Sequence, residues 1–416
     1  MMIRRRTALL GLAASWTLGR SSLALAAPAS RPDEPRFVVV LMRGALDGMA
    51  AVPPYGDPSL ATHRKALLLP EPGQEKGLLD LGGFYGLHPA LSGMHDLYGA
   101  GQFLPIHATA GHYRSRSHFE AQDYLESGAD QRMTSGWLNR AVASLPQHGT
   151  KPDGYGLAMG LTVPLLLRGS AHVGSYAPAA AQHPDPELYN QIAALNDADP
   201  ITGPAYRHAL KARSFSEAVM APDAAPNTPD QAKRKTDNFT MLATAAGHML
   251  ADPQGPRVAA LEIGGWDTHA GQVGRLNGPL SQLDRGIMAL KNSLGPVWDK
   301  TVVLVMTEFG RTVRMNGTSG TDHGTGTVTF VAGGPVTGGR VGGTWPGLKP
   351  SQLFENRDLA PTTDARTIAA GILVEHMGLP RTPLAHALPG STSPPMDALV
   401  RTLYTPPPSF ALPLST

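Results

Sequence analysis

The chain has 416 residues, of which 42% are hydrophobic and 16% are charged, and it contains no cysteine. This is the composition of an ordinary globular protein, and its recurring apolar runs exclude a disordered chain. The formal net charge of +2 provides no basic field for nucleic acid. The lack of cysteine excludes disulfides, thiolate metal ligands and a cysteine nucleophile.

The first 26 residues have the pattern of a secretory signal peptide, with arginines at positions 4–6, an apolar stretch and a small-residue site at 24–26. The sequence RRTALL at 5–10 favours a twin-arginine signal over an ordinary secretory one. We therefore expect a periplasmic or secreted protein. Cleavage after Ala26 would leave 31 basic and 33 acidic residues. No other stretch is long and apolar enough to predict a membrane span.

From residue 36 onward, apolar runs of strand length alternate with helical patterns. Strands are predicted at 37–42, 101–111, 258–263, 302–306 and 326–334. Helices are predicted at 119–126, 237–250, 279–294 and 363–377. Continuous apolar strands that alternate with helices indicate a mainly parallel sheet with helices on both faces, so the expected fold class is α/β.

The segment from about residue 149 to 235 interrupts this alternation. It is rich in Ala, Pro, Asp and Tyr and has weak periodicity, with short helices expected at 186–195 and 201–213. We interpret the segment as an insertion or cap over the sheet, within a single domain that spans residues 27–416.

Polar residues with ligand chemistry gather at the predicted strand ends. They are Asp47, Ser117, His118, Asp267, His269, Glu308, Asp322 and His323. In open α/β sheets, ligands bind beyond the carboxyl ends of the strands, where these side chains would converge. Asp267 and His269 would point to the same side of an extended segment, and His323 would add a third ligand. This set suits Zn²⁺ or Mn²⁺, with Fe²⁺, Mg²⁺ and Ca²⁺ as alternatives.

The remaining residues predict a site for a second metal ion and a site for an anion. Asp47 and Glu308 offer hard oxygen ligands, and two ions about 3.5–4 Å apart can hold both oxygens of a phosphoryl-type transfer. Ser117 stands at the start of a predicted helix, where the helix dipole favours an anion and a nearby metal would lower the hydroxyl pKa. Arg116 and Arg311 are candidate groups for binding a phosphate or sulfate.

Each of these residues, taken alone, also has an ordinary structural explanation. Ser117 alone is a common helix N-cap, Asp47 followed by glycine is a common turn, and Glu308 alone can pair with Arg311. The metal-site prediction therefore depends on several strand ends that carry the same chemistry.

The sequence resembles the bacterial domain-of-unknown-function family 1501, whose members are typically exported by the twin-arginine route. The motifs that carry the resemblance lie between residues 36 and 378 and are VVVLMRGALDGMAAVPPYGD, LHPALSGM, RSHFEAQDYLESG, GWLNR, GGWDTHAGQ, TEFGRT and TDHGTGTVTFVAGGPVTGG. That family is placed within the alkaline phosphatase and sulfatase superfamily. The resemblance implies a three-layer sandwich with two divalent metals beside a serine, threonine or formylglycine nucleophile.

The resemblance also implies roles for individual residues. Asp47 is similar to the metal-binding aspartate of the superfamily's first strand, and Ser117 is similar to its nucleophile. Asp267, His269 and His323 are similar to the ligands of one metal site.

Two departures from the superfamily pattern concern the second metal. Glu308 falls where the superfamily commonly has the aspartate of an Asp-His-Gly motif, and Phe309 stands where that motif has its histidine. The second ion is therefore expected to be weak, absent or completed by His118. Asp322 is expected either to bind metal or to orient His323.

These residues predict an exported metal-dependent hydrolase or transferase that acts on a phosphate or sulfate ester of a small molecule or glycan. Ordinary sulfatase chemistry is disfavoured, because a chain without cysteine has no cysteine-derived formylglycine. Two other classes of function remain open. One is a non-catalytic exported protein with one ion or none, which binds a glycan or an envelope protein partner. The other is a single-metal redox enzyme built on Asp267, His269 and His323.

Overall fold

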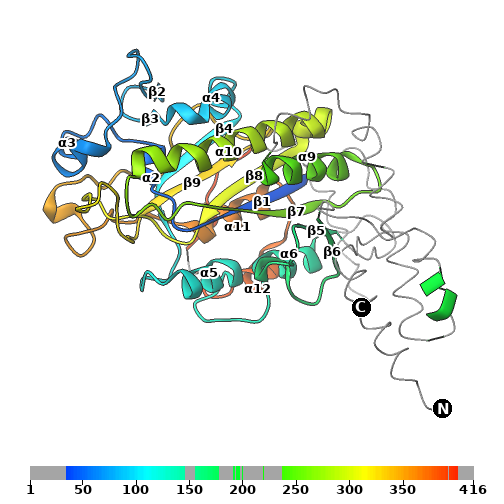
Figure 1. The fold of residues 1–416 in the computed structure, drawn as a ribbon. Coiled ribbons are helices and arrows are strands. Elements are labelled where there is room, and N and C mark those ends of the chain that lie inside the picture. The colour runs from blue at the N-terminus through cyan, green and yellow to red at the C-terminus, as the bar shows by residue number, and fades with distance from the viewer. Residues whose placement is uncertain are drawn as a thin grey trace, which may run out of the picture.

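The computed structural model describes residues 34–145, 155–177, 237–391 and 393–401, together with residues 191, 192, 194–196, 199 and 219. They form an α/β fold in which an eight-stranded sheet lies between two layers of helices (Figure 1). The predicted three-layer architecture with a mainly parallel sheet is confirmed. The predicted signal peptide lies outside the described residues.

The central sheet has the strand order β10-β4-β9-β8-β1-β7-β5-β6. Its strands are β1 (Arg36–Arg43), β4 (Phe103–Ala110), β5 (Gly156–Met159), β6 (Val173–Tyr176), β7 (Val258–Gly264), β8 (Thr301–Thr307), β9 (Thr327–Ala332) and β10 (Thr363–Asp364). Strand β9 runs antiparallel to both β4 and β8, and the other neighbouring pairs are parallel. A separate antiparallel pair consists of β2 (Leu79–Asp80) and β3 (Gly86–Leu87).

Strand β1 lies inside the sheet and is buried on both faces. Phe37, Val39 and Leu41 belong to the hydrophobic cluster on one face, and the residues between them belong to the cluster on the other. This two-sided burial is what a continuous apolar run predicts for a parallel strand.

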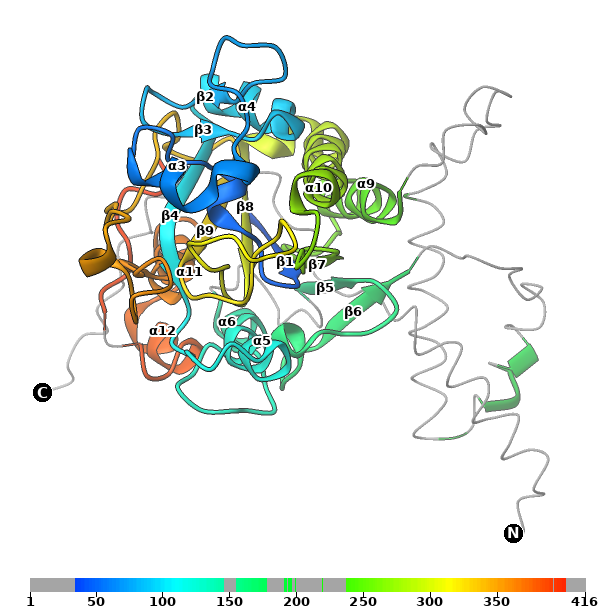
Figure 2. The ribbon, with the colours of Figure 1, turned by 60° about the vertical axis from the view of Figure 1, so that its left-hand side comes forward.

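Helices cover both faces of the sheet (Figure 2). One layer contains α4 (Ser92–Gly99), α9 (Asn238–Ala251) and α10 (Gln272–Leu294), and the other contains α5 (His118–Ser127), α6 (Trp137–Ser144), α11 (Ala365–Glu375) and α12 (Arg381–Ala387). Two short helices, α2 (Gly48–Ala51) and α3 (Ser59–Arg64), follow β1. The short 3-10 segments are Lys65–Leu67, Pro89–Leu91, Leu165–Leu167, Gly295–Lys300 and Pro350–Gln352. In the described part of the chain, no helix combines the length and apolar character that crossing a bilayer requires.

Helix α10 begins earlier than the sequence predicts, because Pro279 lies inside the helix and not at its start. A proline removes one backbone donor, here toward the carbonyl of Arg275. The buried stripe of Leu276, Leu280 and Leu283 continues across this position, so packing on the sheet maintains the helix.

The predicted cap also needs a correction. Residues 155–177 were expected to lie in it, but β5 pairs with β7 and β6 pairs with β5, so this part of the segment extends the central sheet. Strands of four residues are too short to give a clear periodic signal. The rest of the predicted cap, including both of its expected helices, lies almost entirely outside the described residues.

Candidate metal centre

Four side chains converge at the carboxyl edge of the sheet. The Nε2 atom of His323 lies 3.0 Å from Nε2 of His118 and 3.0 Å from Nε2 of His269. The Asp267 carboxylate lies 2.9 Å from Nε2 of His269, 3.2 Å from Nε2 of His323 and 3.7 Å from Nε2 of His118. We call these four residues the histidine cluster.

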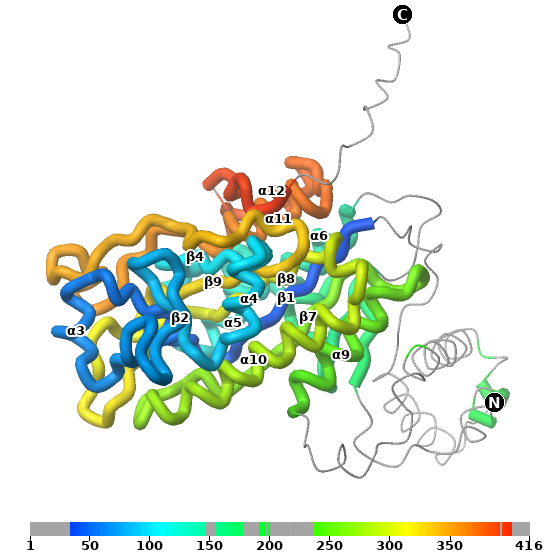
Figure 3. The backbone as a smooth tube through the Cα atoms, turned by 90° about the horizontal axis from the view of Figure 1, so that it is seen from above, coloured from blue at the N-terminus to red at the C-terminus, as the bar shows by residue number. Residues whose placement is uncertain are grey.

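The topology explains why residues so far apart in sequence meet. Asp267 and His269 follow the end of β7, and His118 is the first residue of α5. Strands β8 and β9 are antiparallel neighbours, so the chain between them leaves and re-enters the sheet at the same edge. This loop, which carries His323, therefore returns to the strand ends. It is the yellow loop at the end of the molecule where α3 lies (Figure 3).

The second ring nitrogen of each histidine faces a hydrogen-bond acceptor. The pairs are His118 Nδ1 with Glu308 Oε1 at 2.8 Å, His269 Nδ1 with Asp322 Oδ1 at 3.2 Å, and His323 Nδ1 with the Arg116 carbonyl oxygen at 3.2 Å. Carboxylates and carbonyls only accept, so each Nδ1 carries the hydrogen. Each neutral ring then turns an Nε2 lone pair toward the common point, and orienting acceptors of this kind are typical of metal-bound histidines.

A cation resolves the contacts inside the cluster. Two nitrogen lone pairs 3.0 Å apart repel each other unless a proton or a metal ion lies between them. Around a tetrahedral ion with metal–nitrogen bonds of about 2.0–2.1 Å, the ligand nitrogens are roughly 3.3 Å apart. The exposed fractions of the four side chains range from 23% to 43%, so solvent reaches the cluster. Three imidazoles and one carboxylate therefore form a solvent-accessible donor set that suits Zn²⁺, Mn²⁺ or Fe²⁺.

The carboxylates around the cluster are held in the ionised form. Burial raises the pKa of Glu308, but the hydrogen bonds from His118, Thr307 and Gln122 together outweigh burial, and the net pKa lies below the ordinary value. The Asn316 amide holds the pKa of Asp322 below its ordinary value. The same Glu308 contact raises the pKa of His118, whereas burial lowers that of His323.

Phe309 forms an apolar wall beside the cluster. Its ring centroid lies 4.9 Å from that of His118 and 5.2 Å from that of His323. The ring is buried with Ala45 and Ala121. The position at which the superfamily pattern has a second-site histidine thus presents only carbon to the cluster.

Both arginines predicted to bind an anion are engaged with carboxylates. The fully buried Arg311 side chain donates to Asp267 and to Thr321. Arg116 donates to Asp358 at 2.9 Å and pairs with Glu355. Arg311 therefore orients a residue of the histidine cluster, and Arg116 ties the start of α5 to a neighbouring loop.

Ser117 is the N-cap residue of α5, directly before His118. Its hydroxyl makes no hydrogen bond with any residue that the structure describes, and it caps no backbone amide of the helix. The preceding Arg116 has a φ of 63°, a left-handed conformation that non-glycine residues adopt at a cost. In this conformation the carbonyl of Arg116 faces His323 Nδ1. The Ser117 hydroxyl caps no helix amide, so helix capping does not explain the presence of a serine here.

The structure does not bring Asp47 and Glu308 into the cluster as ligands. Asp47 is bound by Arg64 and Gln272, two residues that the sequence analysis did not single out. Glu308 accepts from His118 and takes the orienting role described above. Arg64 lies outside the motifs quoted above, and Gln272 ends the GGWDTHAGQ motif without any sign there of a contact with Asp47, so only the three-dimensional fold reveals these contacts.

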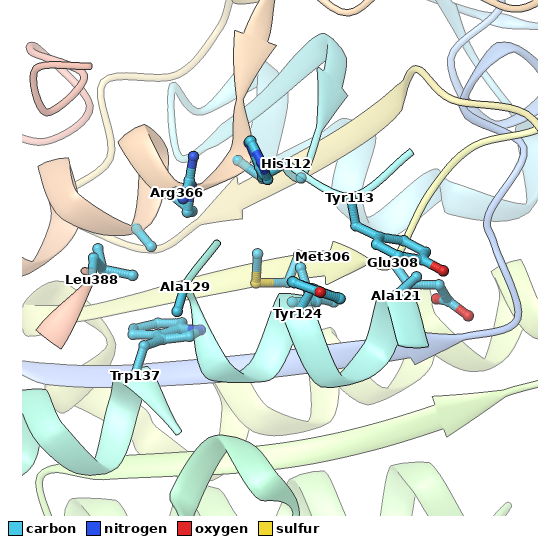
Figure 4. A pocket seen from close by; sticks show the side chains of 14 residues that line it. His112, Tyr113, Ala121, Tyr124, Ala129, Trp137, Met306, Glu308, Arg366 and Leu388 are labelled. Atoms are coloured by element: carbon cyan, nitrogen blue, oxygen red, sulfur yellow. The ribbon is translucent and has the colours of Figure 1, made fainter. Parts of the chain in front are cut away.

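Glu308 also lines a narrow pocket between α5 and α11 (Figure 4). Tyr113, Tyr124, Trp137 and Met306 form much of its wall. The cavity volume is about 20 Å³, which is room for a water molecule or two and not for an ester substrate. The histidine cluster, by contrast, is partly exposed to solvent.

The fold and the cluster together define a three-layer α/β protein with a candidate metal centre at the carboxyl ends of its strands. The family model for a protein of unknown function, DUF1501, matches residues 107–388, and the chain belongs to this family. A search of curated proteins finds no match.

Solved structures of low similarity share parts of this fold. An alkaline phosphatase from the Antarctic bacterium TAB5 is 11% identical with a TM-score of 0.34, covering 74% of this chain and 94% of its own. A 2-O GAG sulfatase is 12% identical with a TM-score of 0.35, covering 83% and 71%. A Vibrio parahaemolyticus protein of the alkaline phosphatase superfamily is 10% identical with a TM-score of 0.36, covering 90% and 77%. Likenesses this distant assign no function, which depends on the side chains of the site.

Proposed function

We propose that this protein is an exported metal-dependent hydrolase or transferase that acts on a phosphate or sulfate ester. The observation that carries the proposal is the convergence of three imidazoles and the Asp267 carboxylate at the start of α5, where Ser117 directly precedes His118 in the chain. Export rests on the signal pattern of residues 1–26, and the esterified group is a small molecule or a glycan.

The histidine cluster is the part of the chain that would hold the ion. His118, His269 and His323 contribute Nε2 atoms, and Asp267 contributes a carboxylate oxygen. When bound, the ion supplies Lewis-acid stabilisation of an ester oxygen and favours the ionised form of a nearby hydroxyl.

Ser117 is the proposed nucleophile. It stands at the start of a ten-residue helix, whose first amide groups and dipole favour an anionic group. The Ser117 oxygen forms a bond to phosphorus or sulfur as the bond to the ester oxygen breaks. The Ser117 proton passes to water, and the departing alkoxide takes a proton from water and leaves as the alcohol. Water, or an acceptor alcohol in a transferase, then removes the group from Ser117.

Turnover of esters by the metal-loaded mature protein tests this proposal. We expect activity on at least one class among phosphomonoesters, phosphodiesters and sulfate esters, and a loss of about 10³-fold or more in kcat for Ser117→Ala. Ser115→Ala, two residues upstream on the same loop, is the matched control and should keep its activity. An absence of turnover with every bound metal, or full activity of Ser117→Ala, would contradict the proposal.

A second candidate function is a single-metal redox enzyme, favoured by the mixed nitrogen and oxygen donors gathered around one point. Such a donor set also suits iron or manganese. Elemental analysis of the protein as isolated separates the two candidates. Iron together with oxygen-dependent chemistry supports the redox enzyme, and zinc together with ester turnover supports the hydrolase.

A further inference from the structure

We propose that this centre binds one metal ion and not two, because two buried arginines hold the carboxylates that a second ion would need. The inference rests on the metal-binding part of the proposed function and not on its ester chemistry. It assigns to Arg64 and Arg311 the role of fixed cations within the site.

The first fixed cation is Arg64, which binds the Asp47 carboxylate. Its Nη1 lies 2.9 Å from one Asp47 oxygen and 2.7 Å from the other. Gln272 donates to the same carboxylate at 2.6 Å. The exposed fractions of the Arg64 and Asp47 side chains are 2% and 0%. An incoming ion would have to displace a buried guanidinium, which would then lose its carboxylate partner and remain buried as an unbalanced charge, so Asp47 is unavailable as a ligand.

Arg64 is itself fixed by the chain around it. Its Nε donates to the Val313 carbonyl at 2.8 Å, and its Nη2 donates to the Thr312 carbonyl. These carbonyls belong to the loop that follows β8, the loop that also carries His323. The guanidinium therefore joins α3 to the loop of the metal site and cannot swing away without losing bonds to it.

The second fixed cation is Arg311, which lies against the histidine cluster. Its Nη1 donates to Oδ1 of Asp267, the oxygen that also lies 2.9 Å from His269 Nε2. Its Nε donates to the Thr321 hydroxyl at 3.2 Å, and that hydroxyl lies 3.5 Å from Asp47. Arg311 thus contacts Asp267 directly and is linked to Asp47 through the Thr321 hydroxyl, so a second ion shared by both carboxylates would compete with this guanidinium.

Glu308, the remaining carboxylate predicted for a second ion, is also fully engaged. Its Oε1 accepts from the Gly44 amide at 2.9 Å, from His118 at 2.8 Å and from Gln122 at 3.1 Å. Its Oε2 accepts from the Thr307 hydroxyl at 2.7 Å. With Phe309 in the next position, this part of the site offers a second ion no histidine and only a carboxylate that four donors already hold.

The test uses Mn²⁺ as the probe on the mature protein. After saturation and removal of loosely bound ions, we expect about one manganese per chain by elemental analysis and by native mass spectrometry. The electron paramagnetic resonance spectrum should be that of an isolated Mn²⁺, without exchange coupling. Two ions per chain, or a coupled pair in the spectrum, would overturn the inference.

A variant of Phe309 tests whether this residue, and not the two arginines, limits the site to one metal ion. Phe309→His supplies the histidine of the superfamily pattern while leaving both arginines in place, so we expect it still to bind one ion. A second ion in this variant would show that Phe309, and not the arginines, limits the site. His323→Ala should lose the ion and serves as the control for binding at the histidine cluster.

The outcomes also separate this inference from the proposed function. A protein that binds one manganese but turns over no ester keeps the inference and contradicts the hydrolase. A protein that hydrolyses esters with two ions keeps the hydrolase and contradicts the inference. A protein that binds no ion contradicts both.

Discussion

The carboxylate of Glu308 lies 2.8 Å from Nδ1 of His118, on the side of the ring away from the histidine cluster. Glu308, itself predicted as a metal ligand, therefore holds the candidate ligand His118 in place. Its burial makes this contact effective, because the negative charge is screened little by water and fixes both the tautomer and the rotation of the imidazole.

Replacement of Glu308 by glutamine should weaken metal binding without removing the site. The amide oxygen still accepts a hydrogen bond from His118 but carries no charge, and loss of such an orienting partner typically costs roughly 10–100-fold in metal affinity. Titration of the zinc-loaded protein with a competing chelator measures this change. Glu75→Gln, at an exposed glutamate, is the control, and an unchanged affinity for Glu308→Gln would refute the orienting role.

Replacement of His323 by alanine should abolish the stabilisation that metal gives to the fold. A ligand present at 100 times its dissociation constant stabilises the native state by about 2.7 kcal/mol, and this gain requires a working site. Thermal melts of wild type and His323→Ala, with Zn²⁺ and with chelator, test the prediction. We expect a metal-dependent rise in Tm only for wild type, and an equal rise in both proteins would place the ion elsewhere.

The structure explains why some parts of this protein were predictable from sequence and others were not. Strand ends of a parallel sheet converge by topology, so Asp267, His269 and His323 could be grouped from the order of apolar runs alone. The pairing of Asp47 with Arg64 could not, because it depends on where the short helix α3 packs. Strands β5 and β6 could not be predicted either, because each has only four residues and these carry no distinct hydrophobic pattern.

The sequence predicted that these charged residues lie near the site, but it did not predict which partner each of them binds. A carboxylate at a strand end is equally suited to bind a metal, an arginine or an imidazole, and only its neighbours decide among these. Glu308 and Asp322 each face an Nδ1 atom, so they orient rings of the histidine cluster. Arg116 and Arg311 are likewise committed to carboxylates, which sequence spacing does not reveal.

Arg357 should bind the anionic group of the substrate, in place of the two committed arginines. Its Nη2 donates to the carbonyl of His323 at 2.8 Å, and its side chain is 40% exposed, with Asp358 no closer than 3.6 Å. A hydrogen bond to a charged group contributes about 1.5–3 kcal/mol, so Arg357→Ala should weaken binding by roughly tenfold or more. Calorimetric titration of wild type and Arg357→Ala with inorganic phosphate and sulfate measures this change in binding affinity directly.

The control for Arg357 is Arg314→Ala, which removes an exposed arginine that donates to the carbonyl of Asn356 at 3.1 Å. We expect Arg314→Ala to leave anion affinity unchanged. If both variants bind phosphate and sulfate as wild type does, Arg357 takes no part in binding the anion. If both lose affinity equally, the effect is one of overall charge.

Acid should destabilise the fold through buried His376, far from the metal centre. Burial lowers the pKa of His376 to about 4, and its Nε2 donates to the carbonyl of Arg36 at 2.9 Å. The unfolded chain takes up this proton below its ordinary pKa of about 6.5, whereas the folded chain does not until about pH 4. Stability is therefore present above this window and is lost as the pH falls through it, by about 3 kcal/mol at most.

Urea unfolding of His376→Gln at several pH values tests this origin of the acid sensitivity. Glutamine can still donate to Arg36 but binds no proton, so the variant should lose less stability than wild type between pH 6.5 and 4. His172→Gln, at an exposed histidine, is the control and should retain the wild-type slope. Parallel pH dependence of wild type and His376→Gln would assign the effect to other groups, such as buried His107.

Gly324 should be the position where the loop of the metal site tolerates least change. A Cβ atom there would lie 2.3 Å from the carbonyl carbon of Arg311, a backbone atom that cannot move aside without shifting the residue that holds Asp267. Gly324→Ala should therefore lower metal affinity together with stability, by about 1–3 kcal/mol in unfolding free energy. Gly317→Ala, on the same loop with open space around its Cβ, is the matched control. Chelator titration and urea unfolding of both variants measure the two effects, and equal behaviour of the two would show that close packing at Gly324 does not shape the site.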